Sequence, residues 1–471
     1  MNSKIPPTGS DRPPVAHSQT SETNEAVTDT TGGDVTKVRK IAAASMAGTA
    51  LEYYDFSIYG LAAALVFPTL FFPQSNTFIA VLASFGTLAI GYLSRPLGAI
   101  VFGHFGDRIG RKPVLVITLV IMGVASTAIG LLPTYSQIGT WAAAILVSLR
   151  FLQGVAFGGE WGGAILMAFE YARPGRRGFF ASVPQVGPAV GTLLGNGVFL
   201  VITLLPEDAM LSWGWRIPFL ISALLVILGL VVRLKLAESP EFTELKGTGT
   251  TARIPIAAVL RSHLEPVLLV CGGFVGYGAF SVVALTFLVG YSRNTLGLDS
   301  SITLTAVLAT CVVQIPTIML GGYASDRFGR RRIMTVGPLA GIAGTFILFW
   351  AISTAQPGWI IVGYVLGMGI LFTSAYGAQP ALFADSFAPS VRYTGMSLGY
   401  QLSNVVGSGM MPLIVTILLD VSGSIYTVAS VIALALLVSM LCLLSLVRTA
   451  EENSAVTDPT ERSATAPISA P

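Results

Sequence analysis

Long apolar runs are the feature of this sequence that most restricts its fold. A helix needs roughly 20 mainly apolar residues to cross the hydrocarbon core of a bilayer, and about twelve runs reach this length. They cover residues 41–66, 77–102, 113–132, 139–168, 179–204, 214–234, 264–290, 302–323, 333–353, 358–380, 394–418 and 424–447. Only 11% of the 471 residues are charged, whereas soluble proteins carry roughly 25%. The sequence therefore predicts an all-α integral membrane protein.

Basic residues alternate between the connections that join these runs. One set of connections holds nearly all of them: Lys37, Arg39, Lys40, Arg108, Arg111, Lys112, Arg173, Arg176, Arg177, Arg233, Lys235, Lys246, Arg253, Arg261, Arg327, Arg330, Arg331, Arg332, Arg392 and Arg448. The other set holds only Arg216 and Arg293. Because short loops rich in Lys and Arg stay in the cytoplasm, we expect both termini and the 235–262 connection to be cytoplasmic.

A sequence repeat divides the chain into two halves. The segment Gly103–Lys112 (GHFGDRIGRK) recurs as Gly322–Arg331 (GYASDRFGRR). The segment Glu170–Arg177 recurs as Asp385–Arg392, with an acid, a proline and an arginine at the same offsets. The two pairs are displaced by 219 and 215 residues, an interval that contains six apolar runs. We therefore predict two pseudo-symmetric six-helix bundles, with a substrate site at their interface near the bilayer midplane.

The composition outside the apolar runs suggests boundaries for these bundles. The first bundle is predicted at residues 37–234 and the second at 263–450, with a cytoplasmic linker at 235–262. Segments 1–36 and 451–471 are polar and poor in bulky apolar residues. Such segments cannot bury enough apolar surface to fold, so we expect two disordered cytoplasmic tails.

Several motifs carry a resemblance to a known family. The loop Gly103–Lys112 and its second copy resemble the signature of the major facilitator superfamily. Further stretches resemble its metabolite:proton symporter family, the importers of shikimate, 2-oxoglutarate, citrate, and proline or betaine; they are Leu51–Tyr59, Ser94–Gly98, Gly103–Arg108, Gly158–Gly163, Trp213–Phe219 and Glu238–Pro240. The resemblance implies a secondary active transporter of the cell inner membrane, which takes up a small organic acid or zwitterion with protons by alternating access. We expect a monomer that binds its cargo, protons and lipid, and no nucleic acid.

Acids and bases gather in the predicted cytoplasmic connections of both halves. The resemblance implies that they form a latch that is made in one transport state and broken in the other. The candidate gate residues are Asp107, Arg108, Arg111, Glu170, Arg177, Glu238, Asp326, Arg327, Arg330, Asp385 and Arg392. We expect Glu170 to pair with Arg177 and Asp385 with Arg392. The alternative is that these groups only set the topology and end the helices.

Five ionisable residues lie deep inside apolar runs, all in the first half: Glu52, Asp55, Arg95, Arg150 and Glu160. Inserting each such charged side chain into the bilayer costs about 2.5–3.5 kcal/mol, so each is a functional candidate by default. A carboxyl that gains and loses an arginine partner changes its affinity for a proton. We therefore predict Asp55 as the main proton carrier and Arg150 as its switching partner, with Glu52 as the competing carrier. The alternative is a fixed ion-pair cluster that holds the first bundle together.

Uncharged polar residues in the spans are candidates for orienting the cargo. The predicted substrate-binding residues are Arg95, Arg150, Tyr54, Gln153, Gln185, Tyr277, Gln314, Tyr376, Gln379, Gln401 and Asn404. Among the uncharged ones we favour Tyr277, Gln314 and Gln379, because the resemblance implies that spans 7, 8 and 10 line the cavity. The two arginines favour an anionic or zwitterionic cargo, since a guanidinium is the natural partner of a carboxylate. For each polar residue the alternative is an ordinary interhelical hydrogen bond.

Other functions have weaker support in the sequence. Gly187–Gly191 (GPAVG) resembles part of a signature of drug/proton antiporters, so a proton-coupled exporter is the alternative function. The tails and the linker are short for a receptor's signalling domain. We expect neither an enzyme nor a cofactor, since there is no nucleophile–base set and no phosphate-binding loop. The three cysteines lie in apolar runs without metal-ligand spacing. Sodium remains an alternative coupling ion.

Overall fold

The structure is a computed structural model, and it describes residues 23–109, 111–158, 161–235, 259, 261, 263–387 and 391–457. Within these ranges the side chains at 23–37, 103–109, 111–112, 115, 232–233, 235 and 452–457 are outside the description. The described residues form helices and turns and contain no strand. The prediction of an all-α protein is confirmed.

Thirteen helical elements lie in the described residues of the first half. They are α1 (Thr23–Leu65), α2 (Phe67–Phe71), α3 (Thr77–Leu93), α4 (Arg95–Ile109), α5 (Arg111–Leu131), α6 (Tyr135–Ile138), α7 (Trp141–Phe157), α8 (Trp161–Glu170), α9 (Arg177–Ser182), α10 (Val186–Thr203), α11 (Glu207–Ser212), the 3₁₀ turn η1 (Gly214–Arg216) and α12 (Ile217–Lys235).

The second half contains more irregular helices. Its elements are α15 (Leu264–Val282), η2 (Val283–Phe287), α16 (Leu288–Asn294), α17 (Ser300–Phe328), α18 (Arg330–Ser353), α19 (Pro357–Gly363), η3 (Tyr364–Phe372), η4 (Tyr376–Ala378), α20 (Gln379–Asp385), α21 (Arg392–Ser403), η5 (Asn404–Met410), α22 (Met411–Ser422) and α23 (Ile425–Thr457). Three of them, η2, η3 and η5, are π-helical segments inside otherwise α-helical spans.

All of the predicted apolar runs fall in helices. Ten described helical stretches are long and apolar enough to cross a membrane, and a shorter apolar helix covers Val116–Leu131. The remaining run, 41–66, coincides with the second part of α1. Large apolar side chains such as Leu131, Leu204 and Leu320 are more than 60% exposed. Apolar surface of this extent marks contact with lipid.

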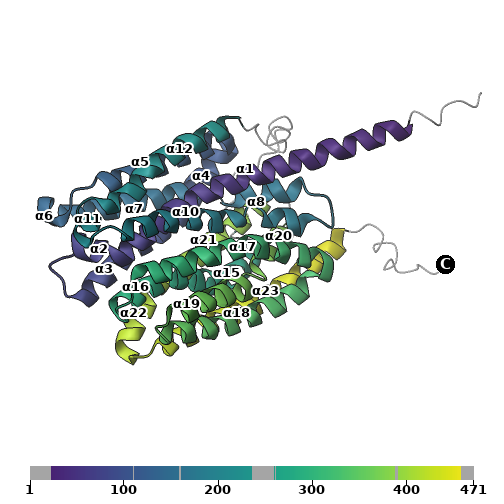
Figure 1. The fold of residues 1–471 in the computed structure, drawn as a ribbon. Coiled ribbons are helices and arrows are strands. Elements are labelled where there is room, and N and C mark those ends of the chain that lie inside the picture. Colours follow the sequence, from purple (N-terminus) through teal and green to yellow (C-terminus); the bar gives the residue numbers. More distant parts are fainter. Residues whose placement is uncertain are drawn as a thin grey trace, which may run out of the picture.

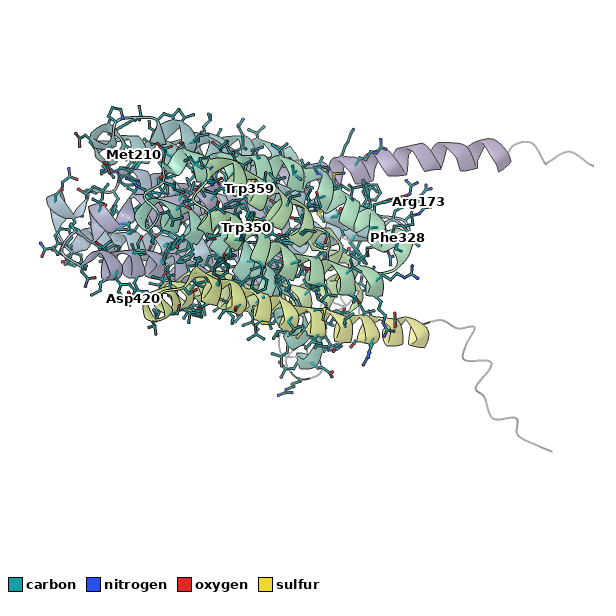
Figure 2. All side chains as sticks on the ribbon, turned by 60° about the horizontal axis from the view of Figure 1, so that its bottom comes forward. Arg173, Met210, Phe328, Trp350, Trp359 and Asp420 are labelled. Atoms are coloured by element: carbon teal, nitrogen blue, oxygen red, sulfur yellow. The ribbon has the colours of Figure 1, made fainter. Side chains whose placement is uncertain are left out.

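The two halves form two bundles that pack side by side (Figure 1). They meet where α10 packs on α17 and where α3 packs on η5. Helix α1 begins and α23 ends at the same end of the molecule (Figure 1). Arg173 and Phe328 lie at that end, whereas Met210 and Asp420 lie at the opposite end (Figure 2). The connections that contain Arg173 and Phe328 are two of those predicted to be cytoplasmic.

Two terminal helices run into the segments that were expected to be disordered tails. Helix α1 begins at Thr23, inside the 1–36 segment, and α23 continues to Thr457. Once a span has nucleated a helix, each further residue adds one hydrogen bond without a new nucleation cost. Residues 1–22 and 458–471, and the linker apart from 235, 259 and 261, lie outside the described residues.

Candidate functional site

A cavity lies between the two halves of the structure. The first half contributes Tyr53, Phe56, Ser57, Tyr92, Pro188, Ala189 and Thr192 to its wall. The second half contributes Phe274, Gly278, Ser281, Val282, Leu285, Thr286, Gln314, Ile318, Met368, Phe372, Tyr376, Asn404 and Ser408. Aromatic rings, aliphatic side chains and uncharged hydroxyl or amide groups form this wall, and none of its residues is an acid or a base. A mainly apolar wall with a few polar groups is typical of a site for a small organic molecule.

Three predicted substrate-binding residues line this cavity: Gln314, Tyr376 and Asn404. The Nε2 of Gln314 donates to Thr373 at 3.1 Å, and the Nδ2 of Asn404 donates to the Tyr400 carbonyl at 2.9 Å. These bonds hold both amides in place on the second-half wall. Only part of each amide's hydrogen-bonding capacity is used, so both can still contact a cargo.

The other predicted residues lie behind the wall: Arg95, Arg150, Tyr54, Gln153, Gln185, Tyr277, Gln379 and Gln401. The Tyr54 hydroxyl donates to the Pro218 carbonyl at 2.8 Å, which is an interhelical bond of the kind weighed as the alternative. Gln401 Nε2 likewise donates to the Gly158 carbonyl at 3.2 Å, across the two halves. In this structure Tyr54 and Gln401 connect helices, and none of the eight side chains lines the cavity.

None of the wall residues from the first half was predicted from the sequence. Tyr53, Phe56 and Ser57 follow one another at helical spacing on α1 and face the cavity. Glu52 and Asp55 share a different face of the same helix and are 2% and 4% exposed. The spacing of residues 53, 56 and 57 could have identified this face as a unit, but nothing in the sequence says which face of a buried helix meets the partner half.

Arg95 and Arg150 lie directly behind the aromatic part of the wall. The guanidinium carbon of Arg95 is 4.1 Å from the ring centre of Phe56 and 3.9 Å from that of Tyr92. The guanidinium carbon of Arg150 is 4.5 Å from the Phe56 ring and 4.0 Å from the Tyr59 ring. These are cation–π distances. Because Phe56 and Tyr92 line the cavity, one aromatic ring separates it from each guanidinium.

A glycine on α3 makes room for Arg150. A Cβ atom added to Gly91 would lie only 2.5 Å from Arg150 Nε and 3.0 Å from its Cδ. Any larger residue at this position would therefore displace the arginine. The absence of a side chain at Gly91 lets the guanidinium cross the backbone of α3 and reach the aromatic rings.

Asp55 and Arg150 do not form a direct ion pair in this structure. The Asp55 carboxyl accepts a hydrogen bond from Ser222 of α12. Arg150 Nη1 donates to Gln153 Oε1 at 3.0 Å, and its Nε and Nη2 have no hydrogen-bond partner in the described part of the chain. The two groups are near neighbours whose charges interact. Of the other predicted coupling residues, Glu52 is buried nearby, and Glu160 lies outside the described residues.

The end of the bundle near Arg173 contains contacts between the halves. The carboxylate of Asp326 on α17 accepts from the backbone N–H groups of Gly178 and Phe179 on α9, at 2.8 and 2.9 Å. Hydrogen bonds to an ionised acceptor are stronger than neutral ones. Asp326 therefore connects the second half to the first at this end.

The ion pairs at this end differ in part from those expected. Asp385 pairs with Arg330, whereas Arg392 Nε donates to the Phe387 carbonyl at 3.2 Å. Arg392 is the first residue of α21, and among the described residues it forms no ion pair with Asp385. Arg177 lies with its guanidinium carbon 4.9 Å from the Phe169 ring, and Arg327 donates to Tyr323 at 3.3 Å. The side chains of Asp107, Arg108, Arg111 and Glu238 lie outside the described residues; Glu170 is described as the last residue of α8.

An aromatic stack lies between the cavity and this end. The rings of Trp161 on α8 and Tyr400 on α21 are parallel within 3°, with centroids 3.6 Å apart. Trp161 Nε1 donates to Gln185 at 3.1 Å, and the hydroxyls of Tyr400 and Tyr53 are 3.1 Å apart. Since Tyr53 lines the cavity, the stack closes the cavity on this side with groups from both halves.

The halves also touch at the opposite end. A Cβ atom on Gly60 of α1 would lie 2.5 Å from a methyl group of Thr286 on η2. Farther out, Arg293 forms an ion pair with Glu207 at 2.9 Å. Contacts between the halves therefore lie on both sides of the cavity.

Comparison with known proteins places this geometry in a family. The family model for the Major Facilitator Superfamily matches residues 45–405. The shikimate transporter of Escherichia coli (strain K12) is 39% identical over 388 residues, which cover 82% of this chain and 89% of that protein. A putative proline/betaine transporter of Staphylococcus aureus (strain COL) is 32% identical over 396 residues, covering 83% of this chain and 84% of that protein.

Solved structures share the fold at lower sequence identity. A proton:xylose symporter bound to 6-bromo-6-deoxy-D-glucose has a TM-score of 0.68 and 16% identity, covering 89% of this chain and 96% of that one. The inward-open xylose transporter from E. coli has a TM-score of 0.65 and 17% identity, covering 89% of this chain and 100% of that one. These likenesses support the arrangement of two six-helix bundles.

Proposed function

This chain belongs to the major facilitator superfamily, and we propose that it imports a small organic acid or zwitterion together with protons. Its relatives and its fold are those of multi-pass membrane transporters rather than enzymes. The single observation that carries the proposal is the placement of Asp55. It is a buried carboxyl near a buried arginine, Arg150, and one aromatic ring separates the guanidinium of that arginine from a cavity whose wall is uncharged.

The proton-binding role of Asp55 follows from its surroundings. An ionised carboxylate inside a membrane protein is stable only with hydrogen bonds or a positive partner. Here Ser222 supplies a hydrogen bond, and Arg150 supplies positive charge without a direct pair. A rearrangement that moved Arg150 would remove this support and favour protonation. Asp55 can therefore take up and release a proton as the transporter changes state.

The cavity suits a cargo with ring or apolar faces and several hydrogen-bonding groups. Stacking surfaces come from Phe56, Phe274, Phe372 and Tyr376. Arg95 and Arg150, one ring behind the wall, would attract a carboxylate: two unit charges about 8 Å apart interact by about 2 kcal/mol at an effective dielectric constant of about 20. A hydroxylated organic acid combines these features, and shikimate, named for the E. coli relative, is the first cargo to test.

Alternating access would use the contacts at the two ends of the cavity. Opening toward the Arg173 end requires Trp161 to leave Tyr400, and Asp326 to leave Gly178 and Phe179. Opening toward the other end requires separation of Gly60 from Thr286, and of Arg293 from Glu207. In this proposal the Arg173 end faces the cytoplasm, both termini are cytoplasmic, and the transporter is a monomer of the inner membrane, with bundles at 37–234 and 263–450.

The glycines that suggested an exporter have a packing role in the structure. A Cβ atom on Gly187 would lie 2.7 Å from Thr49, and one on Gly191 would lie 2.2 Å from the Ala50 carbonyl oxygen. Both glycines therefore allow α10 to pack closely on α1. This accounts for the partial signature without an antiport mechanism, and import remains the better proposal.

Transport into proteoliposomes tests the function directly. The purified full-length chain is given labelled shikimate, 2-oxoglutarate, citrate, proline or glycine betaine outside, with the lumen made alkaline. We expect at least one of these compounds to accumulate, and a protonophore to abolish the accumulation. If none of them accumulates, or if the inward proton gradient drives loss of preloaded cargo, the proposal of proton-coupled import of this substrate class is wrong.

A further inference from the structure

We propose that Ser57 and Gln314 orient the cargo across the cavity and select a small carboxylate that also carries hydroxyl groups. The carboxylate lies toward Ser57 on the first-half wall, and the hydroxyl groups donate to Gln314 on the second-half wall. This inference rests on the proposed function, because it takes this cavity as the cargo site.

A hydrogen bond from α10 determines how Ser57 bonds on its inner side. Asn196 Nδ2 donates to Ser57 Oγ at 2.7 Å and to the Thr192 carbonyl at 2.9 Å. A carbonyl only accepts, so the Asn196 atom that contacts it must be the NH₂ group. Both hydrogens of that group are then used, and Ser57 is the acceptor of one of them. Asn196 is fully buried, so bulk water does not compete for these bonds.

The hydrogen of the Ser57 hydroxyl is therefore still available. Hydroxyls in helices often donate to the carbonyl four residues earlier, as Thr49 does to Ser45 at 3.0 Å. Within the described residues Ser57 makes no such bond and donates to no other group. Because Ser57 lines the cavity, an acceptor on the cargo can take this hydrogen.

Positive charge behind the same part of the wall makes a carboxylate the preferred acceptor. Phe56 precedes Ser57 on α1, and both residues line the cavity. The guanidinium carbons of Arg95 and Arg150 lie 4.1 and 4.5 Å from the Phe56 ring centre. A hydrogen bond to an ionised acceptor is stronger than one to a neutral group. The carboxylate of the cargo is therefore expected on the α1 side of the cavity.

The second half offers the opposite polarity at Gln314 on α17. The Thr373 hydroxyl donates its one hydrogen to the Met368 carbonyl at 2.7 Å. It can only accept from Gln314, so the atom 3.1 Å away must be Nε2 of that amide. Gln314 Oε1 accepts no hydrogen bond from the described part of the chain, and the residue lines the cavity. This oxygen requires a donor, and a hydroxyl group of the cargo supplies one.

Other polar groups of the wall do not set this polarity. Asn404 donates to the Tyr400 carbonyl at 2.9 Å and accepts from Ser408 at 3.1 Å, so both ends of its amide have a partner. The hydroxyls of Thr192 and Ser281 also line the cavity. A hydroxyl can rotate to donate or to accept, so these two groups favour neither end of the cargo.

The two fixed orientations predict which acids the cavity selects. A carboxylic acid without hydroxyl groups leaves Gln314 Oε1 unpaired, and so does a betaine, which has no hydrogen to donate. An acceptor left unpaired in a buried site lowers the affinity by about tenfold or more. A hydroxylated acid should therefore bind more tightly than either of the other two classes.

Equilibrium binding without any gradient tests this selection. The full-length protein in lipid nanodiscs is titrated in a calorimeter with shikimate, with cyclohex-1-ene-1-carboxylate, or with glycine betaine. The second compound has the ring and the carboxylate of shikimate but lacks its hydroxyl groups. We expect shikimate to bind more tightly than both of the others, by about tenfold or more.

Two substitutions should affect the two acids differently. Gln314→Leu should weaken shikimate by about tenfold and leave the hydroxyl-free acid unchanged. Ser57→Ala should weaken both acids by the same factor of about ten, because both carry the carboxylate. Asn196 is a positioning residue, so Asn196→Leu should weaken both acids, with no further effect in a Ser57→Ala background.

Matched controls come from the same two helices. Thr49→Val on α1 and Thr310→Val on α17 each remove a hydroxyl that donates to a carbonyl of its own helix, at 3.0 and 2.9 Å. Neither residue lines the cavity. Both variants should bind the two acids as the unsubstituted protein does.

The outcomes separate this inference from the proposed function. If Gln314→Leu weakens both acids equally, or if Ser57→Ala weakens shikimate alone, the proposed orientation is wrong. If shikimate binds no more tightly than the other two compounds, the proposed selection is wrong, although proton-coupled import of another cargo would stand. Should Gln314→Leu fail to fold, Gln314→Met, which keeps the length of the side chain, decides in its place. If the binding pattern holds but a proton gradient drives no accumulation, the proposed function fails instead.

Discussion

The two halves of this transporter bury different kinds of groups. Within the described part of the chain, the buried charged side chains are Glu52, Asp55, Arg95 and Arg150, all in the first half. The second half buries uncharged groups at its interface, such as Gln314, Gln379 and Asn404. A sequence repeat relates the two halves, so they share a fold although one buries charged groups and the other buries uncharged polar groups. We infer that the first half handles the proton and the second half mainly shapes the cargo site.

The helices of the two halves also differ in their regularity. The π-helical segments η2, η3 and η5 interrupt spans of the second half, and the described spans of the first half contain none. Each segment contributes to the cavity wall, for example through Thr286, Phe372 and Asn404. A π-helical turn interrupts the regular hydrogen-bond ladder and is frequent at functional sites. The second half can therefore adjust its shape around a cargo, whereas the first half holds its charges in regular helices.

The largest expected effect is the loss of coupling in Asp55→Asn. Coupling to one proton supports about a tenfold accumulation per pH unit of gradient, since 1.4 kcal/mol corresponds to a factor of ten. The asparagine cannot release a proton, so the accumulation ratio should fall to about one while exchange of labelled for unlabelled cargo persists. Uptake into proteoliposomes measures both quantities. Asp420→Asn, an exposed acid at the far end of α22, is the control and should accumulate normally.

Gly91→Ala should be the next most damaging change, because it displaces Arg150 without removing any charge. The added Cβ atom would lie 2.5 Å from Arg150 Nε. Overpacking of this kind costs about 1–3 kcal/mol, so we expect gradient-driven uptake to fall by about 10- to 100-fold. Gly86→Ala on the same helix meets nothing within 4 Å and should be neutral. Equal rates of gradient-driven uptake by the two variants would contradict the placement of Arg150.

Gln314→Leu tests the role of the second half in cargo binding. It should weaken the affinity for the cargo without changing the coupling to protons. Gln314 lines the cavity and donates to Thr373. Loss of a hydrogen bond worth about 1–1.5 kcal/mol should raise the KM for the cargo by about tenfold. The accumulation ratio at saturating cargo should not change, because the proton site is untouched. A fall in that ratio with an unchanged KM would overturn the division of roles between the halves.

The smallest effect is expected for Arg293→Gln at the end opposite Arg173. Its ion pair with Glu207 is exposed, with side chains 28% and 69% accessible. Exposed pairs contribute about 0–1 kcal/mol and are screened by salt. We expect a change in uptake rate of about twofold or less at low ionic strength, and none at high ionic strength. A large effect that persists in high salt would mean that this pair is a main gate.

The sequence predicts the spans and the buried charges well, because the bilayer restricts both strongly. A membrane-length run has to be apolar, so a charged residue such as Asp55 inside it is easily recognised. The loop Gly322–Arg331 likewise indicates the two halves, because it repeats the residues of Gly103–Lys112. These features depend on local composition, which one sequence displays directly.

The cavity wall could be predicted only in part, because it depends on which helix faces meet. Tyr53 and Tyr54 are neighbours of similar chemistry, yet one lines the cavity and the other bonds to the Pro218 carbonyl. The cation–π contact of Arg95 with Phe56 joins two different spans, and no sequence spacing shows it. The π-helical segments were also unexpected, because they arise from tertiary packing in runs whose composition suits an ordinary α-helix.

The central claim is that Asp55 carries the proton that moves with the cargo, and proton movement itself is the most direct measurement. Cargo identified in the uptake screen is added outside proteoliposomes that contain a trapped pH-sensitive dye, with no gradient imposed. The account predicts that the lumen acidifies as cargo enters through the unsubstituted protein, and that cargo equilibrates through Asp55→Asn without any change in the dye. Equal acidification by the two proteins would contradict it.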